Sequence, residues 1–377
     1  MTFSKIFLVG GAVRDHLLGI ASKDRDYVVV GSSPEKLLAE GFTQVGASFP
    51  VFLHPVTGDE YALARTERKT GPGYHGFDTV YDSSVTLEDD LARRDLTINS
   101  IAMTDNFQII DPFHGVEDLQ AGILRHTSEA FADDPLRVLR LARFAARYGF
   151  SVAPETMELA KKLVQSGELD ALPRERIWTE LYKGFSEKDP SLMLMVLKQA
   201  GAFDVSPLID YFGSKFDVDA ARHLMKAVES AKTKSNKTDA KAVIAMSAVE
   251  SFSHLVITSS LKVPNHIRDT LILERALTSA LTKDLTAENV AELFKTTRFV
   301  SDFDSGTMQL ALFVSSIRSS VFMQTVVHWV KNLTKLKTVA SAIKRLDMAA
   351  IVASGDMKTV KSRVEAAKFA VIKRRFK

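Results

Sequence analysis

The stretch that decides the fold lies near the start of the chain and reads Leu8-Val-Gly-Gly-Ala-Val-Arg-Asp15, followed by Lys23-Asp-Arg-Asp-Tyr-Val-Val-Val30. An apolar run over residues 6–9 ends at the paired glycines Gly10 and Gly11, and a short helical pattern follows over residues 12–18. A second apolar run begins at Tyr27. This succession of strand, turn, helix and strand predicts an opening domain of the α/β or α+β type.

The glycine pair predicts a turn that an anion can approach closely. The start of helix 12–18 adds unpaired N–H groups and a favourable dipole, and Arg14 stands one turn into this helix, within reach of a phosphate. An ordinary tight turn also requires glycine, so Gly10 and Gly11 alone leave both interpretations open.

Two carboxylates stand at the start of the second strand. Asp24 and Asp26 are separated by one residue, so in a strand they face the same side. Two like charges at the mouth of an apolar strand are costly unless a cation joins them, and all-oxygen ligation is typical of Mg²⁺. The alternative is a solvated strand edge beside Lys23 and Arg25. Glu60, on a later strand pattern, is either a third carboxylate or a rim residue.

Two further segments carry arginine. In residues 87–99, Arg93 and Arg94 follow an acidic turn, and they either bind phosphate or pair with the acids of the same segment. In residues 134–147, Asp134 and Arg137 are neighbours at i and i+3 of a predicted helix. One face of this helix carries four arginines with little acidic compensation nearby in the sequence: Arg137, Arg140, Arg143 and Arg147. This face predicts binding of a triphosphate or of a nucleic-acid backbone, and the Asp–Arg pair could read a base edge.

The remaining pattern predicts a change of architecture along the chain. Strand patterns over residues 50–53 and 60–63 and a helix over 34–40, capped by Ser33, complete the first part. After about residue 127 apolar residues recur every three to four positions and strand patterns stop, which predicts a helical array. Breaks are expected near Gly149, Gly167, Pro173, Gly201 and Pro264. The Gly-rich segment 69–76 predicts a mobile loop.

Composition excludes several classes of protein. The 377 residues contain no cysteine, which excludes a disulfide scaffold, a zinc–thiolate site, an iron–sulfur cluster and a thiol nucleophile. No apolar stretch of about 18 residues occurs, and the first apolar run is too short for a signal peptide, so we expect a cytoplasmic protein without membrane contact.

Residues 331–377 carry thirteen Lys or Arg against three acids, a net charge of +10, which leaves about −7 for the remainder. Such a basic tail indicates either a polyanion partner or a solvated helical end.

Together these motifs resemble the class II tRNA nucleotidyltransferases, the family that contains the bacterial CCA-adding enzymes and poly(A) polymerases. The resemblance covers roughly residues 4–185. It rests on the two opening motifs and on Phe49–His54, Tyr61–Lys69, Leu87–Asp90, Arg93–Asn99 and Asp134–Arg140. It implies an α+β fold in which a small mixed-sheet head, related to DNA polymerase β, precedes an all-helical neck, body and tail. The domains implied are a catalytic head over 1–127, a base-recognising neck over 128–200, a body over 201–265 and a basic, tRNA-binding tail over 266–377.

Motif matching also implies the roles of particular residues. Asp24 and Asp26 would be the catalytic residues and would hold Mg²⁺. The nucleotide would be bound by Gly11, Arg14, Arg94, Asp134, Arg137, Arg140 and Arg143. Within this set, Asp134 and Arg137 would pair with the base of CTP or ATP. Arg140 and Arg143 would bind nearby phosphate.

The activity implied by the resemblance is template-independent addition of C, C and A to the 3′ end of tRNA, from CTP and ATP with release of pyrophosphate. The tRNA would be held by its acceptor arm and elbow, and no obligate protein partner is expected. The nearest alternatives are a bacterial poly(A) polymerase and an enzyme that adds only CC or only A. Residues 46–49 lack the basic side chains of the polymerase branch, which favours CCA addition. The alternative from another class is a non-catalytic RNA-binding protein, against which the intact acids and arginines argue.

The sequence departs from the family pattern in three places. None of the nine histidines is followed by aspartate, so we expect no His-Asp phosphohydrolase activity. Ala47 and Ser48 stand where close relatives carry Arg-Asp, which bears on substrate selection. Asp133 takes the place of a glutamate at the start of the neck motif.

Overall fold

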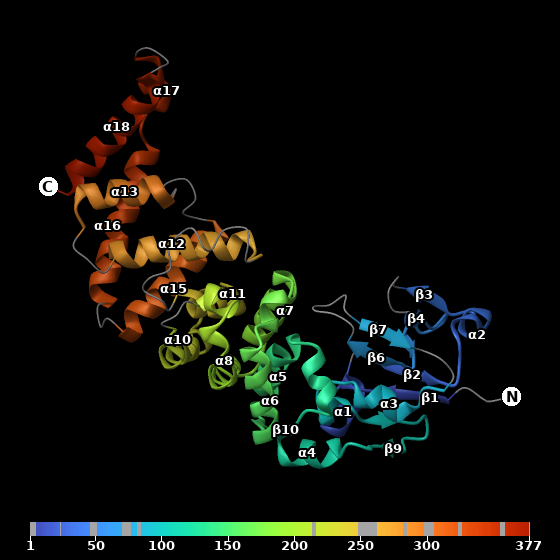
Figure 1. Ribbon diagram of the computed structural model, residues 1–377. Coiled ribbons are helices and arrows are strands. Elements are labelled where there is room, and N and C mark those ends of the chain that lie inside the picture. Colours follow the sequence, from blue (N-terminus) through green and yellow to red (C-terminus); the bar gives the residue numbers. More distant parts are fainter. Residues whose placement is uncertain are drawn as a thin grey trace. The chain divides into compact units, whose positions relative to one another are not determined.

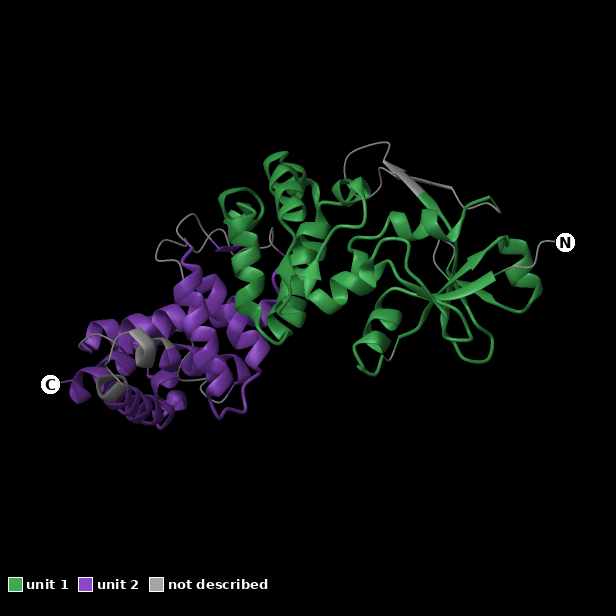
Figure 2. Ribbon diagram, turned by 90° about the horizontal axis from the view of Figure 1, so that it is seen from below, with its two compact units in different colours: residues 1–209 green, residues 210–377 purple. Residues whose placement is uncertain are grey.

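The computed structural model describes most of the chain: residues 5–22, 24–45, 51–69, 77–80, 84–212, 216–247, 262–281, 285–297, 305–322, 326–354 and 359–376. Our predictions for Lys23, for residues 46–49 and for the greater part of the Gly-rich segment 69–76 therefore lie outside the described residues. The chain forms two compact units, residues 1–209 and 210–377, which are shown in different colours in Figure 2. The four-part division into head, neck, body and tail stays a prediction.

The head is built on one seven-stranded mixed sheet (Figure 1). Its strands are β1 (Lys5–Val9), β2 (Asp26–Val30), β3 (Thr43–Val45), β4 (Val51–Leu53), β5 (Glu60–Leu63), β8 (Ala102–Met103) and β9 (Ile109–Ile110). They lie in the order β3-β4-β5-β2-β1-β8-β9, and β2 pairs with β5 in parallel whereas the other neighbours are antiparallel. In the β2–β5 register Asp26 lies opposite Glu60, and Tyr27 opposite Tyr61. Because side chains alternate along a strand, the two acids share one face of the sheet and the two tyrosines share the other.

Short helices and a ribbon surround this sheet. They are α1 (Gly11–Leu17), α2 (Pro34–Ala39), α3 (Leu87–Ala92), the 3₁₀ turn η1 (Thr97–Asn99), α4 (Gly115–Ala121) and the paired strands β6 (Thr66–Lys69) and β7 (Phe77–Val80). Ser33 caps α2 by accepting a hydrogen bond from the Lys36 backbone, as predicted. Phe7, Val9, Val28 and Leu91 belong to the core on the acid face of the sheet. That core packs α3 against β1 and β2, the two strands on which the opening motifs lie.

The rest of unit 1 is almost entirely helical. Its elements are β10 (Ile123–Leu124), η2 (Glu129–Asp133), α5 (Leu136–Tyr148), β11 (Ser151–Val152), α6 (Pro154–Gln165), η3 (Glu168–Ala171), α7 (Arg174–Ser186), α8 (Pro190–Gln199), η4 (Ala202–Asp204) and α9 (Leu208–Phe212), which crosses the unit boundary. Helix α5 begins after Pro135, so the acids Asp133 and Asp134 precede the helix rather than lying in its first turn. The prediction that strands stop after residue 127 is wrong for β11, which pairs with β10. Two residues are too short to show a periodic pattern.

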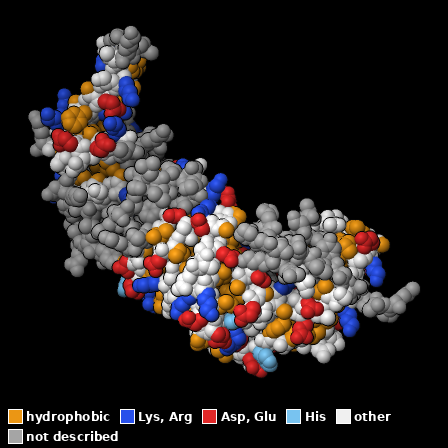
Figure 3. Space-filling model, viewed as in Figure 1, with side chains coloured by type: hydrophobic (Ala, Val, Ile, Leu, Met, Phe, Trp, Pro, Cys, Tyr) orange, Lys and Arg blue, Asp and Glu red, His pale blue; other side chains and the backbone are white. Residues whose placement is uncertain are grey.

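Unit 2 consists of helices in the part of the chain that the structure describes. They are α10 (Val218–Ser230), α11 (Lys237–Ser247), α12 (Asn265–Leu281), α13 (Ala287–Thr297), α15 (Gly306–Phe322), α16 (Val326–Lys344), α17 (Met348–Ala353) and α18 (Val360–Arg375). Ile372 of α18 is buried in the apolar core of this unit, whereas Lys373, Arg374 and Arg375 are exposed. In the space-filling view, basic side chains are interspersed with acidic and apolar ones around α17 and α18 (Figure 3). None of the described helices is long and apolar enough to cross a membrane. A mixed-sheet head followed by helices confirms the predicted α+β class.

Candidate active site

The glycine turn between β1 and α1 brings two arginines together. Gly10 has φ +66°, a left-handed conformation that favours glycine, and a Cβ atom there would lie 2.9 Å from Arg94 Nη1. A Cβ atom on Gly11 would lie 3.4 Å from Arg14 Nη2. The two guanidinium groups therefore pack directly against the backbone of this turn, and only glycine at position 10 leaves room for Arg94.

Arg14 is held by protein partners on several sides. It is 4% exposed, and its Nε and Nη2 donate to Asp15 Oδ1 at 3.0 and 2.8 Å. Its Nη1 donates to Asn99 Oδ1. The guanidinium carbon also lies 5.1 Å from the centre of the Tyr148 ring. Since a guanidinium has five N–H groups, one N–H on each terminal nitrogen remains for another acceptor.

The acid pair lies at the exposed start of β2. Burial by the surrounding protein raises the pKa of Asp26, Arg94 opposes this, and the charge of Asp24 raises the pKa further. The ionised form of Asp26 is therefore disfavoured, and an approaching cation would stabilise it. Among the residues that the structure describes, no group of three or more possible ligands surrounds a metal position. Two carboxylates fit a hard divalent cation that takes its other oxygen ligands from substrate and water.

Asp90 fixes the arginines that follow α3. Its side chain is fully buried; Oδ1 accepts from Arg93 Nη2 at 2.6 Å, and Oδ2 accepts from Arg94 Nη2 at 3.0 Å. Burial alone would raise the pKa of Asp90, but Arg94 and Arg93 outweigh it and the pKa lies below its ordinary value. The predicted alternative of internal ion pairs is thus confirmed for Asp90. Asp89 instead caps α3 by bonding with Thr86.

A buried carboxylate joins the head to α5. Asp95 accepts from Arg140 Nε at 2.7 Å and from Asn99 Nδ2 at 2.9 Å. Burial would raise the pKa of Asp95, but Arg140 and the hydrogen bond from Asn99 lower it to about 2. Because Asn99 also accepts from Arg14, one hydrogen-bonded network runs from α5 to the glycine turn.

A second link from α5 reaches the same turn through Asp15. The Tyr148 hydroxyl donates to Asp15 Oδ1 at 3.2 Å, and Arg147 Nη2 lies 3.5 Å from Oδ2. Burial raises the pKa of Tyr148 to about 12, so its hydroxyl keeps the proton that it donates. No role was predicted from the sequence for Asp15, Asp95, Asn99 or Tyr148. Asp15, Asp95 and Asn99 are polar residues inside the motifs quoted above, and this position was the available indication of a role.

The arginine face of α5 is compensated by acids and carbonyls from other elements. Arg143 is 7% exposed, and its Nε donates to Glu180 Oε2 at 2.6 Å. Arg137 donates at 2.6 Å to each of two backbone carbonyls, those of Ala130 and Arg93. With Arg140 on Asp95 and Arg147 on Asp15, the described contacts correct the picture of an uncompensated stripe.

Asp134, just before α5, is held through its side chain by two other residues. Asp134 Oδ2 accepts from Arg176 Nη2 at 3.1 Å, and Oδ1 accepts from the Leu136 backbone at 3.0 Å. Arg176 lies on α7, so this helix also contributes to the site, although no residue of α7 was predicted to do so.

Two family models match the chain. The model described as the poly A polymerase head domain matches residues 6–125, and the model described as a probable RNA and SrmB binding site of polymerase A matches residues 149–212. The first model covers most of the head and the second covers α6 to α9, whereas α5 lies in the interval between the two matches.

Relatives match somewhat more than half of this chain at high identity. The Multifunctional CCA protein of Chromobacterium violaceum is 55% identical over 235 residues, which cover 60% of this chain and 58% of that protein. The Multifunctional CCA protein of Neisseria gonorrhoeae is 60% identical over 199 residues, which cover 53% of this chain and 48% of that protein. The chain thus matches about half to three-fifths of the length of these relatives.

Solved structures resemble the whole chain at lower identity. A CCA-adding enzyme in an apo form matches with a TM-score of 0.67 at 22% identity, covering 98% of this chain and 88% of that one. The Thermotoga maritima CCA-adding enzyme, complexed with tRNA, matches with a TM-score of 0.64 at 22% identity over the same shares of the two chains. At this identity the likeness shows the fold, including the helical C-terminal half.

Proposed function

We propose that this chain, which belongs over its N-terminal half to the tRNA nucleotidyltransferase/poly(A) polymerase family, adds C, C and A to the 3′ end of tRNA. It uses CTP and ATP without a nucleic-acid template and releases pyrophosphate, in the cytoplasm. The observation that carries the proposal is the exposed Asp24–Asp26 pair, whose charge Arg94 compensates only in part, beside the glycine turn.

In this proposal the acid pair and the glycine turn bind the reacting groups. Asp24 and Asp26 hold Mg²⁺, which when bound neutralises triphosphate charge and lowers the pKa of the attacking 3′-hydroxyl. Arg94, fixed by Asp90, and Arg14, fixed by Asp15 and Asn99, direct N–H donors toward the triphosphate. Gly11 lets the triphosphate approach the backbone at the start of α1. These groups are already oriented, so little reorganisation is needed when the substrate binds.

The neck supplies base recognition in this proposal. Arg137 is fixed by two backbone carbonyls, which sets the plane of its guanidinium for pairing with a base edge. Asp134 is held by Arg176 and retains oxygen lone pairs that can accept from an exocyclic amino group. Arg140 and Arg143 add positive charge for phosphate. Because Arg143 is buried against Glu180, we assign it a smaller contribution than Arg140.

The helical body and tail would bind the acceptor arm and the elbow of tRNA. Every tRNA must be a substrate, so recognition has to use shape and phosphate contacts rather than base sequence. The exposed end of α18, with Lys373, Arg374 and Arg375, suits such a contact.

The proposal is tested by incubating the full chain with Mg²⁺ and a tRNA that lacks its 3′-terminal CCA, giving labelled CTP and ATP separately and together. We expect addition of CC with CTP alone and of CCA with both. Long A tails from ATP would instead identify a poly(A) polymerase, and extension that stops at CC or requires a CC end would identify a partial enzyme. Binding of tRNA without incorporation of either nucleotide would favour the non-catalytic alternative.

A further inference from the structure

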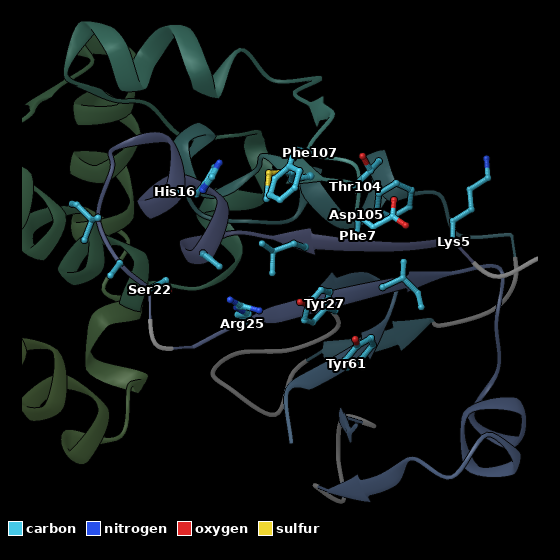
Figure 4. A pocket seen from close by; sticks show the side chains of 16 residues that line it. Lys5, Phe7, His16, Ser22, Arg25, Tyr27, Tyr61, Thr104, Asp105 and Phe107 are labelled. Carbon is cyan, nitrogen blue, oxygen red and sulfur yellow. The ribbon is translucent and has the colours of Figure 1, made fainter. Parts of the chain in front are cut away.

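The face of the head sheet opposite the acid pair carries an open groove (Figure 4). It has a volume of about 1,080 Å³ and runs along β1, from which Lys5, Ile6 and Leu8 line it. Tyr27 and Tyr61 line it as well, and both alternate with the acids of β2 and β5. None of the residues assigned to the candidate active site is among those that line the groove.

An aromatic stack ends at this groove. The rings of Tyr27 and Tyr61 are stacked with centres 4.5 Å apart and 14° between their planes. His54 stacks on Tyr61 with ring centres 5.7 Å apart. On its other side Tyr27 lies beside Leu8, its register partner on β1, so a flat ring that enters the groove would contact both side chains.

The opposite wall holds a second aromatic side chain in the open. Phe107, in the turn between β8 and β9, is 69% exposed and stacks on His16 with ring centres 6.1 Å apart. Its φ of +63° lies in the left-handed region, which is strained for a bulky residue and is retained where a site requires it. The floor between the two walls is apolar, and Ile6 there is 47% exposed. Apolar side chains gathered in the open in this way mark a binding surface.

Positive charge stands at both ends of the groove. Lys5 begins β1 opposite Val30, so its Cβ atom is on the acid face, but its long, exposed side chain lines this end of the groove. Arg25 directly precedes Asp26, the register partner of Val9 at the other end of the strand. Four residue spacings separate Lys5 from Val9, or about 13 Å. Both basic side chains are exposed, and no ion pair joins either one to a carboxylate within the described residues. Asp105 is the acid among the lining residues, and Ser22 and Thr104 add hydroxyl groups.

We propose that this groove binds a short single-stranded segment of RNA. Its bases would stack against Tyr27 and Phe107, and its phosphates would pair with Lys5 and Arg25. An aromatic platform flanked by cations is the arrangement by which proteins bind single strands without reading sequence. The two separated cations and a volume beyond that of one nucleotide favour a strand over a free nucleotide. The site lies across the sheet from the acid pair, so RNA here leaves the active site open, and the inference does not rest on the transferase activity.

The test uses the full chain and an oligouridine ten nucleotides long that contains 4-thiouridine. After irradiation, peptides are mapped for crosslinks, and affinity is measured by fluorescence anisotropy of the labelled oligonucleotide. We expect crosslinks within residues 5–8 and 103–107 and at Arg25 or Tyr27, which line the groove, and not at Asp24 or Asp26. Phe107→Ala and Arg25→Gln should each weaken binding about tenfold, because one stacked base or one phosphate contact is lost. Phe107→Tyr should restore binding, since it keeps a stacking ring.

Matched controls separate the groove from the rest of the head surface. Val56→Ala removes an apolar side chain that is 86% exposed and Lys36→Gln removes an exposed cation, both outside the groove, and neither should change affinity. Crosslinks confined to other regions, or equal affinity in Phe107→Ala and wild type, would overturn the proposal. So would labelling by 4-thiouridine monophosphate that excess oligonucleotide does not displace. A dimer that Ile6→Glu dissociates, without crosslinks in the groove, would show that a second copy of the chain covers it.

Discussion

Two sets of acids in the head differ in what neutralises them. Asp24 and Asp26 are exposed at the start of β2, and their mutual charge helps to raise the pKa of Asp26. Asp15, Asp90 and Asp95 are at most 6% exposed, and each bonds to at least one guanidinium group of the same chain. Asp24 and Asp26 can therefore bind a cation from solution, whereas the charges of Asp15, Asp90 and Asp95 pair with arginines and hold them in place. The first set suits ligand binding, and the second orients the residues around it.

The largest expected effect comes from removing the unneutralised pair. Asp24→Ala and Asp26→Asn should each lower nucleotide incorporation by at least about a thousandfold, because the stabilisation of developing charge by a metal is worth several kcal/mol. Neither should destabilise the fold, since the raised pKa of Asp26 shows that its charge is unfavourable in the folded chain. Single-turnover incorporation and thermal unfolding measure the two effects. Glu40→Gln, at an exposed acid of the head away from the pair, is the control, and near-normal turnover in Asp24→Ala would end the metal assignment.

Asp90→Asn removes the charge of one of the buried acids, and both the free energy of unfolding and nucleotide incorporation should fall. The variant leaves Arg93 and Arg94 without their buried partner, which should cost about 3–5 kcal/mol of the free energy of unfolding. Arg94 loses its fixed position beside Gly10, so we expect incorporation to fall by about one hundredfold, with the KM for the nucleotide raised. Denaturant unfolding and steady-state kinetics check this. A variant as stable as wild type would remove the distinction between the two sets.

The pH dependence of stability sharpens the comparison further. The pKa of Asp95 is about 2 in the folded chain, below its value near 3.9 when unfolded, so ionised Asp95 stabilises the fold. This contribution of about 2 kcal/mol is fully present above the unfolded pKa and is lost as the pH falls from about 4 toward 2. Comparing wild type with Asp95→Asn by denaturant unfolding at pH 5 and pH 3 should therefore show a smaller loss in the variant. Equal losses would mean that Asp95 is not the group that titrates.

The smallest effect is expected at the exposed basic side chains that end α18. Replacing Lys373, Arg374 and Arg375 with Gln should raise the apparent KM for tRNA a few-fold and leave the KM for ATP almost unchanged. Each lost phosphate contact should flatten the log–log salt dependence by about 0.7–0.9. Folding should persist because Ile372, which anchors α18, is retained. Lys226→Gln, at another exposed site in unit 2, is the control, and an unchanged salt slope would reduce the tail to a solvated helical end.

Local patterns predicted the elements that position the site. The strands near residues 6–9, 27–30 and 60–63, the cap at Ser33 and the helix breaks at the glycines follow from side-chain periodicity and backbone preference. The short strands β3, β8, β9, β10 and β11 were not predicted, because two or three residues carry no period of their own. Their pairing is decided by neighbours that are distant in sequence.

The sequence by itself determined which residue types stand at the turn, at the start of β2 and on α5, since these depend on spacing of a few residues. Only the tertiary structure decided which charge neutralises which. Asp134 pairs with Arg176, Arg143 with Glu180, and Asp15 accepts from Tyr148, which is 133 residues away. The stripe of α5 looked uncompensated because its partners lie on other elements. Electrostatic attraction depends on distance in space and on burial, and neither quantity is written in the order of residues along the chain.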